Sequence, residues 1–261
     1  MRIDILTLFP ESMLDVLADS ILGRAQERGI LHIEAHQIRS YTLNKQCQVD
    51  DYPYGGGRGA IMQADPLYRC WDHVRQQTAG KVHTVYLSPC GHTFCQEDAI
   101  RLSKMDNLVL VCGHYEGIDQ RFIDECVDEE ISLGDFVLTG GEIAAMAVAD
   151  AVSRMVPGVL ADPECFEDES HYSGTLEYPQ YTRPAVWHGR EVPEILQSGH
   201  HGNIEAWRHQ RSLENTLRKR PDLIKKARLD ARDKKFVDEL RLVIKAEKES
   251  VLQDSPTDKE E

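Results

Sequence analysis

The chain has 261 residues, of which 41% are hydrophobic and 28% charged, the balance of a globular protein with room for two domains. No apolar run approaches the roughly 18 residues of a membrane span, and the first residues lack the features of an export signal, so we expect neither a membrane protein nor an exported one. The net charge of -14 argues against indiscriminate binding of nucleic acids, which depends on Lys and Arg, although a local basic surface can still bind them.

The first 160 residues alternate short apolar runs with amphipathic stretches. The predicted strands cover 3–9, 31–38, 82–88 and 108–112, and the predicted helices cover 11–28, 65–77, 96–103, 119–124 and 142–156. Pro66 stands in the first turn of the helix at 65–77, where proline is favoured. This alternation predicts a parallel α/β sheet.

The seven cysteines are odd in number, irregularly spaced and without a Cys-x-x-Cys pair. We therefore expect reduced thiols and a cytoplasmic location. Cys90, His92 and Cys95 suggest a metal site, but no second pair of ligands stands at zinc spacing. Ordinary thiols are the simpler interpretation, and we predict no metal ligands.

The composition changes from residue 161 to residue 183, where acids, Ser, Tyr, Gly and Pro follow no helical or strand period. We interpret this segment as a linker between a domain of residues 1–160 and a small all-α domain of residues 184–250. The helical domain is predicted to contain a helix at 203–220 with Asn203 as N-cap, a second opened by Pro221, and a third at 233–251. The apolar face of the third helix contains Phe236, Leu240, Val243 and Ile244. Residues 251–261 are predicted to be a disordered tail.

Positive charge concentrates in the predicted helical domain. Between Gly199 and Arg228 there are eight Lys or Arg and three acids, a local excess of five in an acidic chain. Such an excess is typical of a solvated helix face and also of a surface that binds nucleic acid, and the pattern alone favours neither.

Three glycine-bearing loops, 87–91, 112–119 and 131–142, stand at the carboxyl ends of predicted strands. Open parallel sheets bind their ligands at this edge, and glycine lets backbone groups approach a ligand closely. The chain has no Gly-x-Gly-x-x-Gly after its first strand and no Gly-Lys-Ser/Thr loop, which weakens NAD and ATP as ligands. We therefore predict that the three loops converge on a different small ligand.

Five motifs are far more specific together than any one alone. They are VDDYPYGGGRG at 49–59, GHYEGID at 113–119, SLGDFVLTGGE at 132–142, Ser153-Arg154 before PGVL at 157–160, and YPQYTRP at 178–184. In these motifs the chain resembles the bacterial tRNA (guanine-N1)-methyltransferase family, colinearly from Met1 to about Lys245. The family usually has Met where this chain has Ala60.

The resemblance implies a fold of the SPOUT type, an α/β parallel-sheet domain with a C-terminal trefoil knot followed by a small all-α domain. It also implies S-adenosylmethionine held by the knot loops and a homodimer with active sites at the subunit interface, and it leaves a role for Mg²⁺ open. The residues it assigns to S-adenosylmethionine are Tyr86, Leu87, Ser88, Pro89, Gly91, Gly113, Tyr115, Glu116, Gly117, Ser132, Leu133, Gly134, Asp135, Phe136, Val137, Leu138, Gly140 and Gly141.

The activity implied is methyl transfer to ring nitrogen 1 of the guanine just 3′ of the anticodon in tRNA, which maintains the reading frame. This nitrogen must lose its proton, so a general base is needed; a carboxylate can serve, while a cation near the guanine carbonyl oxygen stabilises the negative charge that develops there. Arg154 fits the cation of the family. The base of the family is an Asp before Ser-Phe, whereas this chain has Glu169 before Ser170; we favour Glu169, with Asp168 as the alternative.

Contacts to the anticodon arm are expected to position phosphates rather than to read bases. The candidate residues are Tyr54, Arg58, Arg183, Arg208 and Arg211.

Two other functions remain open. A catalytically silent RNA-binding module is favoured by the Glu at 169, and a small-molecule methyltransferase would not need the basic helices.

Overall fold

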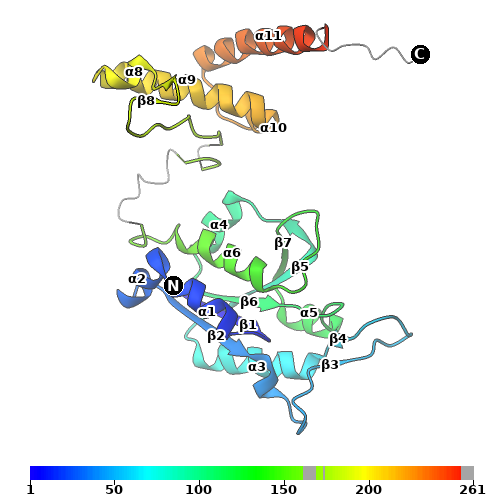
Figure 1. The fold of residues 1–261 in the computed structure, drawn as a ribbon. Helices are drawn as coiled ribbons and strands as arrows, with labels where there is room; N and C mark the ends of the chain where they lie inside the picture. Colours follow the sequence, from blue (N-terminus) through cyan, green and yellow to red (C-terminus); the bar gives the residue numbers. More distant parts are fainter. Residues whose placement is uncertain (161–168, 173, 254–261) are drawn as a thin grey trace, which may run out of the picture. The chain divides into compact units, whose positions relative to one another are not determined.

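The computed structural model of the protein describes residues 1–160, 169–172 and 174–253. The chain divides into two units, Met1–Pro163 and Glu164–Glu261, and each is described by itself (Figure 1). None of the helices in the described part combines the length and the apolar character that crossing a membrane requires.

The first unit contains a parallel sheet of five strands in the order β2-β1-β6-β5-β7, as the alternating sequence pattern predicts. Its strands are β1 (Arg2–Thr7), β2 (His32–Gln37), β5 (His83–Thr93), β6 (Asn107–Cys112) and β7 (Glu129–Ser132). Its helices are α1 (Glu11–Leu17), α2 (Ser20–Glu27), η1 (Ile38–Tyr41), α3 (Ala64–Gln77), α4 (Gln96–Leu102), α5 (Gln120–Cys126) and α6 (Glu142–Ser153), and β3 (Asp50–Asp51) pairs with β4 (Ile61–Met62).

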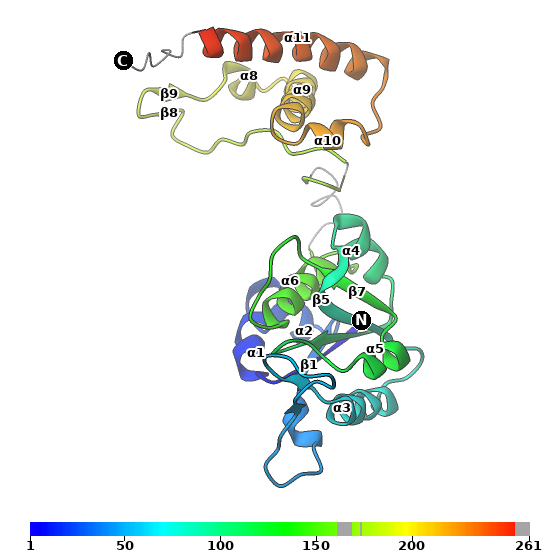
Figure 2. The ribbon, with the colours of Figure 1, turned by 90° about the vertical axis from the view of Figure 1, so that its right-hand side faces the viewer.

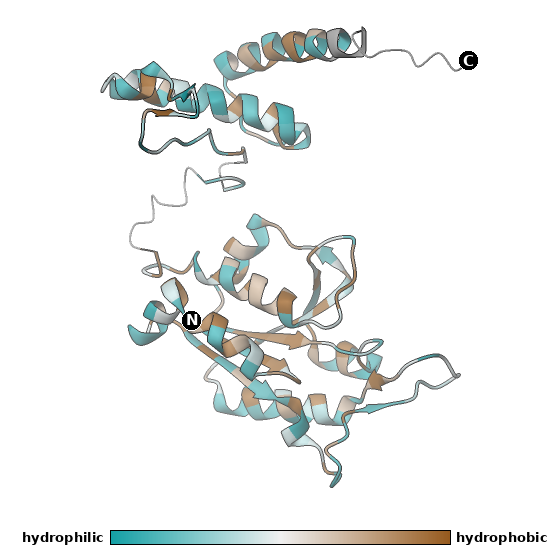
Figure 3. Cartoon of the chain, viewed as in Figure 1, coloured by the Kyte–Doolittle hydropathy of each residue, from teal (hydrophilic) through white to brown (hydrophobic). Residues whose placement is uncertain are grey.

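Helices cover both faces of this sheet. On one face, Leu67 of α3 and Phe122 of α5 pack with Leu6 of β1 and Val111 of β6 in one core cluster. Because side chains alternate along a strand, Ile5 points to the other face, where α6 packs against β1 and β6 and α1 packs against α6 (Figure 2). The central strand β6 is buried along its whole length and is coloured hydrophobic in Figure 3. Apolar burial on both faces is typical of parallel sheets.

Three elements differ from the prediction. No range was predicted for β7, the fifth strand of the sheet. The helix predicted at 11–28 is broken into α1 and α2, because Asp19 adopts an extended backbone and its side chain accepts a hydrogen bond from the Ser20 N–H at 2.6 Å, capping α2. Strand β5 continues past residue 88 to Thr93. After a register shift it pairs with β7 a second time, His92 with Ile131 and Thr93 with Ser132.

The second unit is mainly helical. Its elements are β8 (Val186–Trp187), β9 (Arg190–Glu191), α8 (Glu194–Gln197), α9 (His201–Lys219), α10 (Pro221–Ile224) and α11 (Ala231–Gln253). Leu213, Leu217, Ile224 and Val237 form its core, packed against Leu229, Phe236, Leu240 and Ile244.

Two details predicted for this unit are wrong. Asn203 is not the N-cap of α9: the helix begins at His201, and its first turn is closed by the Asn203 N–H donating to the His200 carbonyl at 3.1 Å. Val243 is 50% exposed rather than in the core, because the face of α11 that packs inward carries Phe236, Leu240 and Ile244 at intervals of four. The predicted tail beyond Gln253 lies outside the described residues.

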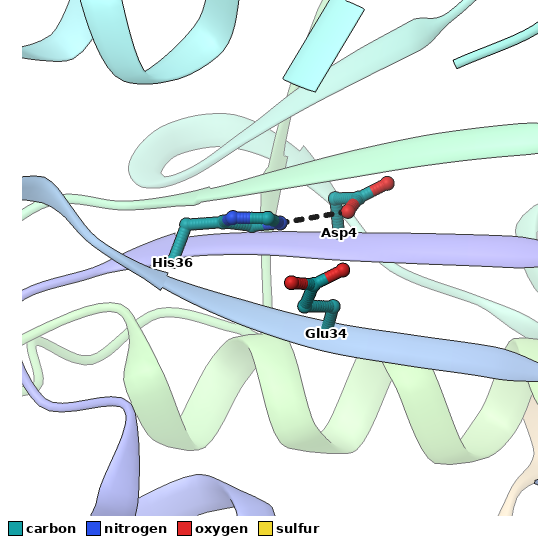
Figure 4. Close-up of side chains that lie close together, drawn as sticks. All are labelled: Asp4, Glu34 and His36. Atoms are coloured by element: carbon teal, nitrogen blue, oxygen red, sulfur yellow. Dashed lines mark hydrogen bonds and ion pairs between the residues drawn. The ribbon is translucent and has the colours of Figure 1, made fainter. Parts of the chain in front are cut away.

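A buried ionic cluster joins β1 to the edge strand β2 (Figure 4). The carboxylate of Asp4, 1% exposed, lies 2.7 Å from Nε2 of His36 and accepts hydrogen bonds from Nε and Nη2 of Arg2 at 2.6 and 2.7 Å. Nη2 of Arg2 also lies 3.2 Å from Glu34. Asp4, Glu34 and His36 are side chains of the kind that bind metals. Here the Arg2 guanidinium already supplies the positive charge beside both carboxylates, so we interpret the cluster as structural.

Asp4→Asn tests the stabilisation from this cluster. Burial raises the pKa of Asp4, but hydrogen bonds with His36 and Arg2 outweigh burial and lower the pKa below its ordinary value. A lowered pKa contributes stability above the unfolded-state pKa of roughly 4, and this stability is lost as the pH falls through the folded-state pKa. We expect Asp4→Asn to lose about 1–3 kcal/mol of unfolding free energy at neutral pH, and less as the pH falls below about 4.

Urea unfolding of both proteins between neutral pH and about pH 3 measures this difference. Glu34→Gln is the matched control, because Glu34 contacts the same guanidinium but its side chain is 48% exposed, so its loss should be smaller. If the loss of unfolding free energy in Asp4→Asn stayed constant with pH, the interpretation would be contradicted.

Candidate functional site

The three glycine-bearing segments enclose a cavity of about 420 Å³. It lies at the carboxyl ends of β6 and β7 and beside residues 86–90 of β5, where that strand shifts register against β7. Leu87 and Ser88 of β5 form one wall, residues 113–118 after β6 form the second, and residues 132–133 and 136–141 after β7 form the third. Ala144, in the first turn of α6, also lines the cavity. The convergence predicted from the sequence is therefore present within the first unit.

Backbone approaches backbone where the second and third loops meet. The N–H of Gly141 donates to the carbonyl of Gly113 at 2.9 Å, and residues 114 and 140 form an antiparallel bridge. A Cβ atom on Gly141 would lie 2.7 Å from Cα of Cys112, closer than real Cβ atoms come to other atoms. Glycine at 141 is therefore required by space rather than by flexibility.

The loop after β6 contains two backbone conformations with positive φ. Tyr115 has a φ of 60° and Gly117 a φ of 130°, and the first of these is unusual for a residue with a side chain. The loop is held from outside, because the Glu116 N–H donates to Ala60 at 3.0 Å and the Met62 N–H donates to Gly117 at 2.9 Å. Strained conformations fixed in this way are common at ligand sites.

The charged side chains among the described residues that line the cavity are the acids Glu116 and Glu130. Tyr86 of β5 also lines the cavity and is buried. Its burial, together with the nearby charges of Glu130 and Cys90, raises its pKa to about 12. Its phenol group is therefore neutral at physiological pH. Its hydroxyl lies close to Gly113, since a Cβ atom added to Gly113 would be only 2.8 Å from it. Such a lining suits a ligand with positive charge, and it offers no Lys or Arg to a phosphate.

Most residues predicted for the S-adenosylmethionine pocket line this cavity. Gly91, Gly134 and Asp135 are not among the described residues that do. Gly91 packs against strand β7, where a Cβ atom would lie 2.4 Å from the carbonyl carbon of Glu130, and Gly134 makes a turn with a φ of 150°. The lining residues that sequence reasoning missed are Cys90, His114, Ile118, Gln120, Ile123, Glu130, Ile131, Thr139 and Ala144. Most of these residues lie inside or beside the predicted motifs. Their position next to predicted lining residues is the sequence feature that could have indicated them.

The predicted catalytic residues lie in different parts of the chain. Arg154 is half-buried at the C-terminal end of α6, in the first unit. Glu169 is half-buried in the second unit, and Asp168 lies outside the described residues.

The residues predicted to contact tRNA also occur in both units. Tyr54 and Arg58 are exposed on the loop before β4, and Arg183 is exposed before a cis peptide bond to Pro184. The guanidinium of Arg208 lies 5.0 Å from the ring centre of Tyr178, a cation–π contact. Arg211 forms an ion pair with Glu214, so part of its charge is already neutralised within α9.

A larger cavity, of about 540 Å³, lies between α3, α5 and the β3–β4 hairpin. Asp51, Asp65 and Glu125 are on its rim, and Arg121 there is bound to Asp119 at 2.7 Å. Its walls are sides of helices and the β3–β4 hairpin rather than the carboxyl ends of the parallel strands. Its position therefore lacks the usual relation of a ligand site to a parallel sheet.

The cluster considered for metal binding contains other interactions. His92 lies 3.3 Å from Asp98, and the Cys95 thiol donates to the same carboxylate at 3.2 Å. Burial raises the pKa of Cys95, which favours the protonated thiol over the thiolate that binds metals. These contacts favour the interpretation of Cys95 as an ordinary thiol.

Comparisons with known proteins identify the family of the chain. Residues 1–226 match the model of the family described as tRNA (Guanine-1)-methyltransferase TrmD. A tRNA (guanine-N(1)-)-methyltransferase of Clostridium perfringens (strain 13) is 56% identical over 237 residues, covering 91% of this chain and 99% of the relative. A protein of the same name from Alkaliphilus oremlandii is 52% identical over 246 residues, covering 92% of this chain and 99% of the relative. The chain therefore belongs to the tRNA (guanine-1)-methyltransferase TrmD family.

Proposed function

We propose that this protein transfers a methyl group from S-adenosylmethionine to ring nitrogen 1 of the guanine just 3′ of the anticodon in tRNA. The observation that carries the proposal is the backbone-walled cavity between β5 and the ends of β6 and β7 in a member of this family. S-adenosylmethionine, when bound, supplies an electrophilic methyl group on a positively charged sulfur.

The lining of the cavity fits this donor. The acids Glu116 and Glu130 complement its positive charge, and the absence of a side chain at Gly113 and Gly140 lets the adenosine and methionine parts approach the backbone. The lack of basic residues among the described lining residues disfavours ligands with phosphate groups, such as NAD or ATP.

Deprotonation of the guanine is the task of a carboxylate outside the cavity. Glu169 is our proposed base, with Asp168 as the alternative, and Arg154 is proposed to stabilise the negative charge that develops on the guanine carbonyl oxygen. A base extruded from the RNA and held beside the donor would bring its nitrogen within roughly 3–3.5 Å of the methyl group.

The position of Arg154 supports an active site built from two subunits. Gly141 precedes α6 and Arg154 follows it, and a helix of 12 residues is about 18 Å long at roughly 1.5 Å per residue. This length exceeds the extension of an arginine side chain. We propose that the Arg154 that meets the guanine belongs to the second subunit of a homodimer.

Apolar surface on the first unit supports the same homodimer. Val16 of α1 and Ile143 of α6 are 61% and 57% exposed on helices that pack together, and Phe9 nearby in the chain is 44% exposed. Exposed apolar side chains on neighbouring helices favour a protein–protein contact.

The proposal retains the expected organisation: residues 1–160 bind the donor, residues 161–183 link the domains and supply the base, and residues 184–250 bind tRNA. A trefoil knot in the first domain is supported by the return of residues 140–141 to the end of β6. We assign no residues to Mg²⁺, because the group of potential metal ligands in the described part, Asp4, Glu34 and His36, is held by Arg2.

Gly141→Ala should weaken the binding of S-adenosylmethionine by at least about tenfold, roughly 1.4 kcal/mol, because the new methyl group would push the third loop away from Cys112. Isothermal titration calorimetry measures the affinity, and thermal unfolding checks that the variant is folded. Gly202→Ala is the matched control, since nothing lies within 4 Å of a Cβ atom there. Unchanged donor affinity in folded Gly141→Ala would place the donor elsewhere.

Catalysis is tested with Glu169→Gln, Asp168→Asn and Arg154→Ala on anticodon-arm RNA, with mass spectrometry to count methyl groups. The wild type should add one methyl group, and Glu169→Gln should be slower by about 10²–10⁴-fold because a general base is lost. Arg154→Ala should also slow the reaction, and all three variants should bind S-adenosylmethionine normally. Full activity of Glu169→Gln with an inactive Asp168→Asn would move the base to Asp168. No methylation by the wild type would favour the RNA-binding module.

A further inference from the structure

The short hairpin of β8 and β9 in the second unit has a fixed geometry. Trp187 pairs with Arg190 and Val186 with Glu191, and the Val192 N–H donates to Ala185 at 2.9 Å, which extends the pairing. The two turn residues, His188 and Gly189, have φ angles of 49° and 72°. Positive φ at both positions is typical of a type I′ turn, whose twist matches the paired strands.

Trp187 is 63% exposed on this hairpin. An indole usually contributes a large buried area, so exposure on a short, fixed hairpin indicates a contact surface rather than a core position. The ring makes a T-shaped contact with His188, with ring centres 4.4 Å apart and planes at 75°. This contact restrains the indole while most of the residue stays open to solvent.

The charge around Trp187 points to the class of ligand. Arg190 is its cross-strand partner, and since paired residues share a face of a hairpin, the guanidinium and the indole lie on the same side. Arg190 and Arg183 are both exposed, in a unit whose residues 199–228 carry a local excess of five positive charges. An aromatic ring that stacks on a base, beside a cation that binds a phosphate, is the usual combination in proteins that bind unpaired nucleotides.

We propose that Trp187 stacks on an unpaired base of the tRNA substrate while Arg190 contacts a neighbouring phosphate. The proposal rests on the proposed function and adds to it a contact to a base, where the other candidate residues were expected to position phosphates. Val186 points to the opposite face of the hairpin and takes no part in this contact.

The test measures binding of a full-length tRNA transcript to the full-length protein by fluorescence anisotropy of a labelled RNA. Trp187→Ala should weaken binding by about tenfold, because a stacked base is lost, whereas Trp187→Phe should stay within about threefold of the wild type. Val186→Ala is the matched control: Val186 is 54% exposed on the same hairpin, and its loss should leave binding unchanged. In methyl transfer, Trp187→Ala should raise KM for tRNA and leave kcat and S-adenosylmethionine affinity unchanged.

Intrinsic fluorescence gives a second, direct readout. The chain has three tryptophans, so the quenching that tRNA causes in the wild type should be reduced in Trp187→Phe. Equal quenching in both proteins, wild-type binding by Trp187→Ala, or an equal loss in Val186→Ala would each overturn the proposal. These outcomes are distinct from failure of the proposed function, in which the wild type itself would add no methyl group.

Discussion

The backbone of Gly141 lies against the backbone of Cys112 and Gly113, and the architecture of the cavity depends on this approach. A hydrogen bond of 2.9 Å from Gly141 to Gly113 joins the loop after β7 to the end of β6, with no space for a side chain at 141. Helix α6 starts directly after this junction and packs on the sheet, so the same contact also determines where Arg154 lies, at the far end of that helix.

The distribution of charge explains how an acidic protein can act on RNA. The cavity proposed for the donor contains acids, which suit a positively charged sulfur, whereas the positive excess of residues 199–228 is in the other unit. Ion pairs such as Arg218 with Glu247 and Arg220 with Asp222 neutralise part of the positive charge of that region. The chain therefore offers a limited number of cations to phosphates, which fits selective rather than indiscriminate RNA binding.

The sequence predicts the regular elements well wherever local pattern determines them. Buried apolar runs correctly indicate β1, β5 and β6, and amphipathic spacing indicates α3 and α6. The order of the strands, the second pairing of β5 with β7 and the two-residue strands of the hairpins depend on contacts between distant residues or are too short to show a period. The break before Ser20 depends on one side-chain cap at Asp19, within a continuous helical pattern.

For the candidate site, the glycine loops and their convergence follow from the sequence, because glycine after a buried strand has a clear physical role. The proposed identity of the ligand depends on resemblance to a family, because the loops alone do not specify it. Glu130 and Ile131 join the lining because β7 pairs them with Tyr86 and Leu87 of β5, a pairing that no motif indicates. His114 was overlooked between two predicted neighbours, Gly113 and Tyr115.

The most direct test of the account is hydrogen–deuterium exchange of the full-length protein with and without S-adenosylmethionine. If the three loops hold the donor through their backbone, residues 87–91, 113–117 and 132–141 should exchange more slowly when it is added, and the region of the larger cavity around α3 and α5 should not change. Protection around that larger cavity instead, or no protection at donor concentrations that support methyl transfer, would contradict the account.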